Sequence, residues 1–116
     1  MVVDQLLPEQ EIDRIFHALA DSTRRDILGR AIAGDLSVSA LARRYEMSFA
    51  AVQKHVAVLE RATLVTKERR GREQIVHANG VTIRTAMELL DQYERLWIAR
   101  INQITNLLEN PEGATR

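Results

Sequence analysis

Apolar residues recur every three or four positions over most of this chain, and that spacing predicts helices. An apolar stripe follows Pro8, a residue that is tolerated in the first turn of a helix. Asp21, Ser37 and Ser48 have side chains suited to cap the start of a helix, and Gly34 can stop one. Five helices are therefore expected, at about residues 8–19, 22–33, 38–45, 49–63 and 81–109.

Residues 65–78 have a different pattern. Val65–Arg70 and residues 74–78 alternate between apolar and polar side chains, as paired strands do, around a turn at Gly71. A short helix, a tight connection around Glu46 and Met47, a second helix and a basic hairpin thus follow one another. This order predicts a mainly α fold with a small β-hairpin, the winged helix-turn-helix, with five helices and a wing of two or three strands.

The helix expected at 49–63 has two distinct faces. Its apolar side should pack on the preceding helices and consists of Val52, Val56 and Leu59. The opposite side of the first two turns is where such a helix presents side chains to the major groove of duplex DNA. Gln53 can pair with adenine, and Lys54 with guanine or a phosphate. Phe49 or Ala50 can touch a thymine methyl group, and Ser48 can offer its hydroxyl or the helix N-terminus to a phosphate. The alternative is that this side is only a solvated face.

The expected hairpin carries basic residues near its turn. Arg69, Arg70 and Arg72 lie beside Gly71, which can adopt a positive φ. Arginine at a flexible tip suits a minor groove or the flanking backbone, so these three residues are candidate DNA contacts. The alternative is a charged tip that is merely solvated, since acidic residues are interspersed. Other candidate phosphate contacts, each of which can equally form an intramolecular pair, are Arg24, Arg25, Arg43 and Arg44.

The chain has 116 residues and a formal net charge of zero, but its charges are unevenly distributed. Residues 21–79 contain eleven Lys and Arg against seven Asp and Glu, whereas the segments on either side are acidic. Phosphate contact depends on local potential, so this excess favours nucleic-acid binding by the central segment. The absence of cysteine excludes disulfides and thiolate metal sites. No apolar run approaches the ~20 residues of a membrane span, and we expect a soluble, cytoplasmic protein.

The last expected helix carries more apolar surface than one small domain can cover. Its apolar seam recurs at steps of three and four, which favours a dimer interface shared with the first helix. Tyr93 and Trp97 could instead line a ligand pocket between subunits. Residues 1–109 are then one domain with dimerisation helices at both ends, and residues 110–116 a disordered tail. The expected interface residues are Ile12, Phe16, Leu90, Tyr93, Trp97, Ile101, Ile104 and Leu108.

Two segments of the chain resemble a known family. They are ALADSTRRDIL, at residues 18–28, and SFAAVQKHVAVLERATLV, at residues 48–65. With them, residues 12–108 are similar to the ArsR/SmtB family of bacterial winged-helix transcriptional repressors. The resemblance implies a homodimer built from the first and last helices and an operator with twofold symmetry. It also implies that the recognition-helix positions at Phe49, Ala50, Gln53 and Lys54 face the major groove.

The metal ligands of that family are missing from this chain. Metal-sensing members often have cysteines at or near the positions of Val38 and Ala40. Others have paired ligands that include histidine on the last helix, where this chain offers only Asp91 and Glu94. The histidines lie in three different expected elements, at His17, His55 and His77. We therefore expect no metal site and no cofactor.

The sequence does not predict an enzyme. No serine lies in a nucleophile-elbow context, no glycine-rich phosphate loop occurs, and no histidine is expected to share a face with carboxylates. A DNA-binding transcriptional regulator is predicted instead, as a homodimeric repressor of an inverted-repeat operator, with double-stranded DNA and itself as partners. The alternatives are a winged-helix module for protein–protein contact and a repressor that responds to a small molecule at the dimer interface. No residue pattern names an effector.

Overall fold

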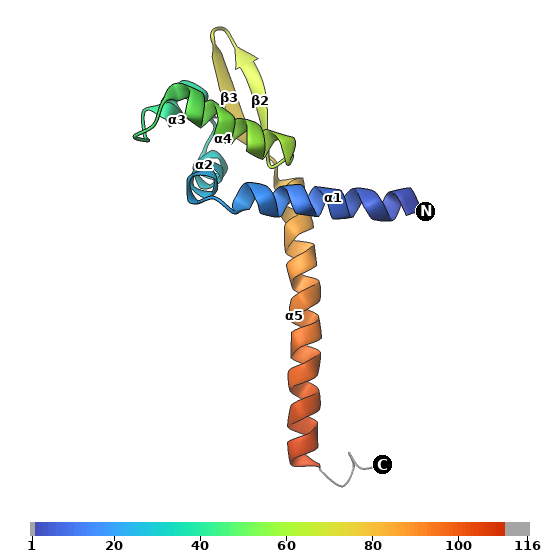
Figure 1. Ribbon diagram of the computed structural model, residues 1–116. Coiled ribbons are helices and arrows are strands. Elements are labelled where there is room, and N and C mark those ends of the chain that lie inside the picture. Colours follow the sequence, from blue (N-terminus) through green and yellow to red (C-terminus); the bar gives the residue numbers. More distant parts are fainter. Residues whose placement is uncertain (1, 111–116) are drawn as a thin grey trace. The chain divides into compact units, whose positions relative to one another are not determined.

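The computed structural model describes the backbone of residues 2–110 and the side chains of residues 9–110. Contacts divide the chain into two compact units, one that extends to Arg84 and one that begins at Thr85, and each is described by itself. The helices and the antiparallel sheet confirm the predicted winged helix-turn-helix class. In chain order the elements are α1 (Val2–Leu19), α2 (Ser22–Ala33), β1 (Leu36–Ser37), α3 (Val38–Ala42), α4 (Phe49–Arg61), β2 (Val65–Arg70), β3 (Glu73–Ala78) and α5 (Gly80–Glu109) (Figure 1).

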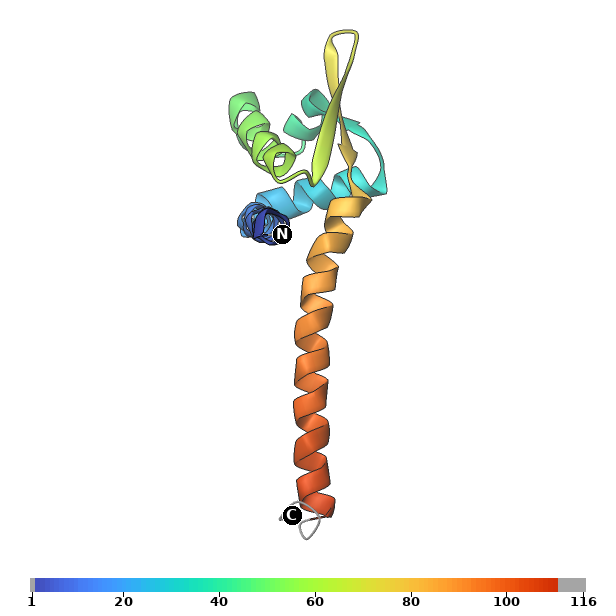
Figure 2. The same cartoon turned by 90° about the vertical axis from the view of Figure 1, so that its right-hand side faces the viewer.

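The first unit packs α1 to α4 with a three-stranded antiparallel sheet, in which β3 is the central strand. The register of β2 and β3 runs from Val65 opposite Ala78 to Arg70 opposite Glu73. Their hairpin projects beyond the helices of this unit (Figure 2). The largest fully buried side chains form the core of the unit and come from all four helices, from β2 and β3, and from the segment before β2: Ile15, Ile27, Leu41, Val52, Val56, Leu59, Leu64, Val65 and Val76.

The three predicted helix caps are confirmed. Ser37 and Ser48 each accept a hydrogen bond on Oγ from the backbone amide three residues later, at 3.0 and 3.1 Å. Asp21 accepts one from the backbone amide of Arg24 at 3.0 Å, and this bond is the main cause of the lowered pKa of its carboxyl group. Each side chain satisfies an amide that has no partner within its own helix, which fixes where α2, α3 and α4 begin.

Some element ends differ from the sequence expectation. α1 begins at Val2, earlier than the expected start at Pro8. α3 ends at Ala42 and does not reach Tyr45, because the amides of Arg44 and Tyr45 bond to carbonyls three residues earlier instead of four. The Tyr45 hydroxyl donates its proton to Asp26 of α2. The last strand and the last helix each begin one residue earlier than expected.

The end of α4 is set by backbone conformation. α4 ends at Arg61, before the expected Thr63, which adopts a left-handed conformation with φ of 61°. Two hydrogen bonds close the helix there, from the amide of Thr63 to the carbonyl of Glu60 and from the amide of Leu64 to the carbonyl of Leu59, at 2.9 and 3.0 Å. The left-handed region is unfavourable for a β-branched residue, so the packing on both sides must hold Thr63 in this conformation.

β1 supplies the third strand of the wing. Its two residues pair with β3, Leu36 opposite Val76 and Ser37 opposite Ile75. Ser37 is therefore both the last residue of β1 and the N-cap of α3. Ser37 therefore connects the sheet directly to the start of the helix-turn-helix.

The second unit contains the continuation of α5 from Thr85. Every side chain from Leu90 to Asn110 is exposed in the single chain. None of the helices in the described part is long and apolar enough to cross a lipid bilayer. Of the tail expected to be disordered, only Asn110 is described, and residues 111–116 lie outside the described residues. The organisation as one domain with dimerisation helices stays a prediction.

Candidate nucleic-acid interface

The two faces of α4 lie as the sequence indicates. Val52, Val56 and Leu59 are completely buried, which confirms the inner face. Gln53 and Lys54 are exposed, as are Ser48, Ala50 and Phe49, the last with 46% of its surface accessible. The five candidate DNA contacts of this helix are thus all open to a ligand.

A groove of about 180 Å³ lies between α4 and the wing. Phe49 and Gln53 line it from the helix, and Arg69 and Arg72 line it from the wing. Two groups of residues that the sequence suggested separately therefore share one concave surface. The other lining residues, which the sequence interpretation did not single out for this site, are Val38, Ser39, Glu73 and Gln74.

The arginines of the wing differ in their partners. Arg69 donates from Nε to the carbonyl of Gly71 at 3.2 Å, which braces the turn where Gly71 has φ of 62°. Arg70 pairs through Nη2 with Glu68 at 3.0 Å. Arg72 has neither a hydrogen bond nor an ion pair with any described residue, and its side chain is exposed. Arg72 is therefore the wing cation that can meet a phosphate without giving up an existing partner.

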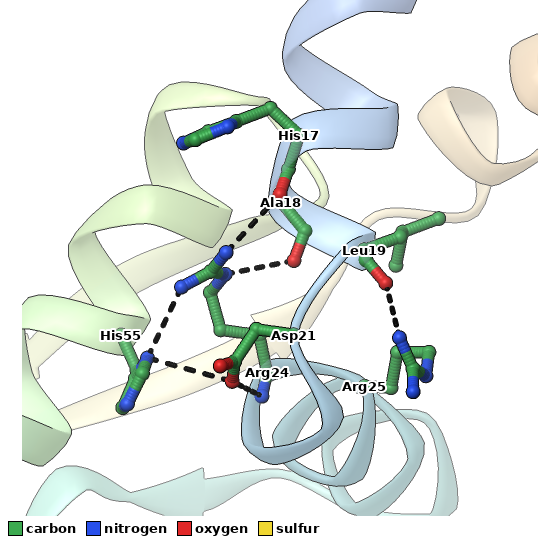
Figure 3. Close-up of polar contacts among 7 residues, drawn as sticks. All are labelled: His17, Ala18, Leu19, Asp21, Arg24, Arg25 and His55. Carbon is green, nitrogen blue, oxygen red and sulfur yellow. Dashed lines mark hydrogen bonds and ion pairs between the residues drawn. The ribbon is translucent and has the colours of Figure 1, made fainter.

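Arg24 and Arg25 have intramolecular partners (Figure 3). The Arg24 guanidinium donates to the carbonyls of Ala18 and His17, at 2.8 and 3.1 Å. Arg25 donates from Nη1 to the carbonyl of Leu19 at 2.6 Å. The last carbonyls of a helix lack partners within it, and both arginines supply them to α1. The structure therefore matches the intramolecular alternative for these two candidates.

Arg43 and Arg44 follow α3 and are exposed. Arg44 contributes to the lowered pKa of Asp26, whose main causes are hydrogen bonds from Tyr45 and from Arg30. Arg30 donates to that carboxylate from Nε at 2.8 Å, and the cluster ties the helix-turn-helix connection to α2. The Arg43 guanidinium makes no hydrogen bond or ion pair within residues 9–110, so it stays a candidate phosphate contact.

One polar cluster contradicts the sequence interpretation. The expectation that no histidine shares a face with carboxylates is wrong, because His77 lies between Asp35 and Glu68. Its Nδ1 is 3.0 Å from Asp35 and its Nε2 is 2.9 Å from Glu68. These contacts, the one with Glu68 first, raise the pKa of His77, and His77 in turn lowers the pKa of Glu68. Both ring nitrogens are already engaged, and no metal-binding group of three or more such side chains occurs among the described residues.

The strand register explains the cluster. Glu68 is opposite Ile75 and Thr66 is opposite His77, so Glu68 and His77 are diagonal neighbours on one face of the hairpin. Asp35 precedes β1, which pairs with the other side of β3. The position of the hairpin turn at Gly71 could have indicated the contact of His77 with Glu68. The contact of His77 with Asp35 required knowledge of β1.

The apolar positions of α5 are uncovered in the single chain. Along one helical face, exposed fractions range from 42% at Ile101 to 79% at Leu108. The others on this face are Leu90, Tyr93, Trp97 and Ile104, all between 47% and 61% exposed. On α1, Phe16 is exposed and Ile12 is half-buried. Exposed apolar surface of this extent is typical of an interaction site.

Known proteins share both sequence and fold with this chain, although no family model matches it. It is 33% identical over 98 residues to the HTH-type transcriptional regulator Rv2034 of Mycobacterium tuberculosis, covering 84% of this chain and 89% of that protein. An ArsR-like transcriptional regulator from Rhodococcus matches with a TM-score of 0.74 and 31% identity, over 85% of this chain and 93% of the other. A homodimeric winged helix-turn-helix DNA-binding domain from Mycobacterium bovis, a possible ArsR-family regulator, matches with a TM-score of 0.62 and 25% identity, over 80% and 86%. The chain therefore belongs to the ArsR family of winged helix-turn-helix transcriptional regulators.

Proposed function

We propose that this chain is a homodimeric repressor that binds an inverted repeat in duplex DNA through α4 and the wing. The observation that carries the proposal is the groove lined by Phe49 and Gln53 on one side and by Arg69 and Arg72 on the other. Apolar, amide and guanidinium groups meet there, and these are the groups that contact thymine methyls, adenine edges and phosphates.

α4 supplies the base contacts in this proposal. Gln53 forms the bidentate pair with adenine, and Lys54 reaches guanine or a phosphate. The small Ala50 permits close approach, and Phe49 rests on a thymine methyl. Ser48 accepts the capping hydrogen bond on Oγ and keeps its own hydroxyl proton to donate to a phosphate at the helix N-terminus.

The wing supplies anchoring contacts that do not depend on sequence. Arg72 meets a phosphate directly, since it has no partner to leave within the described residues. Arg70 also contacts the backbone, but it must first exchange its ion pair with Glu68. Arg69 contributes through the part of its guanidinium that does not brace Gly71.

The twofold arrangement follows from the exposed seam of α5 together with α1. The Mycobacterium bovis domain, which is homodimeric, supports this part of the proposal. Two recognition helices about 34 Å apart enter successive major grooves on one side of the duplex. In a bacterial cytoplasm, a dimer bound across a promoter would repress by occluding RNA polymerase.

A mobility-shift titration on the region upstream of the gene, with a pooled random duplex library beside it, tests the proposal. We expect a complex whose affinity falls with salt, with a slope of log K against log[salt] of about −0.9 for each neutralised phosphate. A protein–protein module would give no shift on either DNA at low salt, and that result would overturn the proposal.

Two variants separate base reading from anchoring. Gln53→Ala should change the preferred base at one position of each half-site. It should also weaken the binding free energy for the preferred sequence by about 1–3 kcal/mol. Arg72→Ala should weaken binding to all sequences alike and make the salt slope shallower by about 0.9 per lost phosphate contact. Arg70→Ala serves as the matched comparison and should have the smaller effect, because its ion pair already engages it. Equal losses on all sequences for Gln53→Ala and Arg72→Ala would refute this division.

A further inference from the structure

Three elements of the first unit meet at the side chain of Arg24 (Figure 3). Its Nε and Nη2 donate to the carbonyls of Ala18 and His17, at the end of α1. Its Nη1 is 3.4 Å from Nδ1 of His55, which belongs to the recognition helix α4. One side chain that starts on α2 thus joins α1 to α4.

Arginine is suited to this position for physical reasons. Its planar guanidinium carries several donors in a fixed geometry, so it can reach two adjacent carbonyls with one side of the group and a third partner with the other. A cation also interacts favourably with the carbonyl end of a helix. The lysine ammonium has one donor centre at the end of a flexible stem and cannot reproduce this arrangement.

The backbone of Arg24 is held as firmly as its side chain. Asp21 accepts a hydrogen bond from the amide of Arg24 at 3.0 Å, and the same carboxylate is 3.9 Å from Nδ1 of His55. His55 has 23% of its side chain accessible and Asp21 has 36%, so the cluster is partly shielded from water. Asp21, Arg24 and His55 therefore form a connected bracket between the end of α1 and the side of α4.

We propose that Arg24 is a positioning residue for DNA binding, which fixes α4 relative to α1 and thereby sets the distance between the two recognition helices of the dimer. The inference rests on the proposed function, because it requires a dimer in which α1 lies at the interface. Twofold symmetry copies any displacement at the bracket into both subunits, so a small local change alters the spacing that the operator must match.

Arg25 provides a matched control from the adjacent position. It also donates to a carbonyl of α1, that of Leu19 at 2.6 Å, and it is also an arginine of α2. Its guanidinium makes no contact with α4 among the hydrogen bonds and ion pairs of residues 9–110. Removing Arg25 therefore removes one helix-end contact but leaves the bracket in place.

The test measures the binding of full-length variants to operators whose half-sites are moved apart or together by single base pairs. When the half-sites are displaced so that the dimer cannot bind both at once, the affinity of the wild type should fall roughly 100-fold or more, because the second half-site no longer contributes. Arg25→Gln should retain that discrimination. Arg24→Gln should bind the operators of different spacing with affinities within about tenfold of one another. Its base preference within each half-site and its salt slope should be unchanged. Circular dichroism confirms that each variant is folded.

Several results would contradict the inference. If Arg24→Gln keeps the spacing preference of the wild type, the bracket does not position α4. If the salt slope becomes shallower by about 0.9 for each arginine removed, Arg24 is instead a phosphate contact. Should Arg24→Gln fail to fold, His55→Gln removes the α4 end of the bracket and keeps the cap on α1, and it should relax the spacing preference in the same direction. Failure of the wild type to bind any duplex overturns the proposed function itself, which is a distinct outcome.

Discussion

Ile104→Ala is the most direct test of the proposed dimer interface. Ile104 lies on the apolar seam of α5 and exposes 47% of its surface in the single chain. The change removes three carbon atoms, each worth about 0.8 kcal/mol when fully buried. If this exposed 47% becomes buried in the dimer, the loss per subunit is about 1.1 kcal/mol.

Twofold symmetry doubles the effect, because each dimer contains two substituted residues. The loss of about 2.3 kcal/mol per dimer corresponds to a dissociation constant raised roughly 50-fold. Sedimentation velocity over a concentration series measures this constant. Asn106→Ala is the matched control, since Asn106 lies on the opposite side of the same helix and is also exposed.

The outcome distinguishes an interface from a surface that is merely apolar. Ile104→Ala should shift the protein toward monomer, whereas Asn106→Ala should leave the dissociation constant unchanged. A wild type that sediments as a monomer at all accessible concentrations would refute the reasoning. Equal behaviour of the two variants would show that the dimer uses another face.

The remaining predictions concern the elements that carry the proposed DNA-binding surface. Ser48→Ala should lower the free energy of unfolding by about 1 kcal/mol in urea titrations, because it removes the N-cap of α4, and an unchanged midpoint would contradict this. Gly71→Val should cost about 1–2 kcal/mol in the same assay, since φ of 62° is unfavourable for a side chain although no atom lies within 4 Å, and Gly71→Asn should cost less. The stability of the wild type relative to His77→Gln should be greatest between the ordinary pKa values of Glu68 and His77, 4.5 and 6.5. On the alkaline side the advantage is complete below the ordinary pKa of 6.5 and disappears as pH rises through the raised value. On the acidic side it is lost as pH falls through the lowered pKa of Glu68, and a pH-independent difference would contradict the reading.

Local features of this fold were predictable because local chemistry determines them. Ser37 and Ser48 begin helices since their hydroxyls satisfy amides three residues later, a relation that needs no tertiary information. The burial of Val52 and Val56 follows from their shared helical face. The end of α3 was harder to predict from the sequence, because Tyr45 contacts α2 through a hydrogen bond to Asp26, nineteen residues away along the chain.

Long polar side chains mark the limit of sequence reasoning for the candidate site. Arg24 and Arg72 are the same residue type in basic surroundings, and nothing local distinguishes a helix-end contact from an unpartnered wing cation. Their difference depends on where α1 ends in space, which places the carbonyls of Ala18 and His17 within reach of Arg24. The contact of His77 with Glu68 was predictable in principle, because the position of the turn sets the strand register and the register sets this contact.

The double role of Ser37 has a consequence for protein engineering. Because this residue ends β1 and also caps α3, no cut can separate the sheet from the helix-turn-helix without damaging one of them. Recognition specificity could not be transplanted to another scaffold as α3 and α4 alone, since that graft would lack both the strand pairing with Ile75 and the cap. Any transferable cassette must therefore contain at least residues 36–78, from the first residue of β1 to the last residue of β3, and the parts of α1 and α2 that pack on α4.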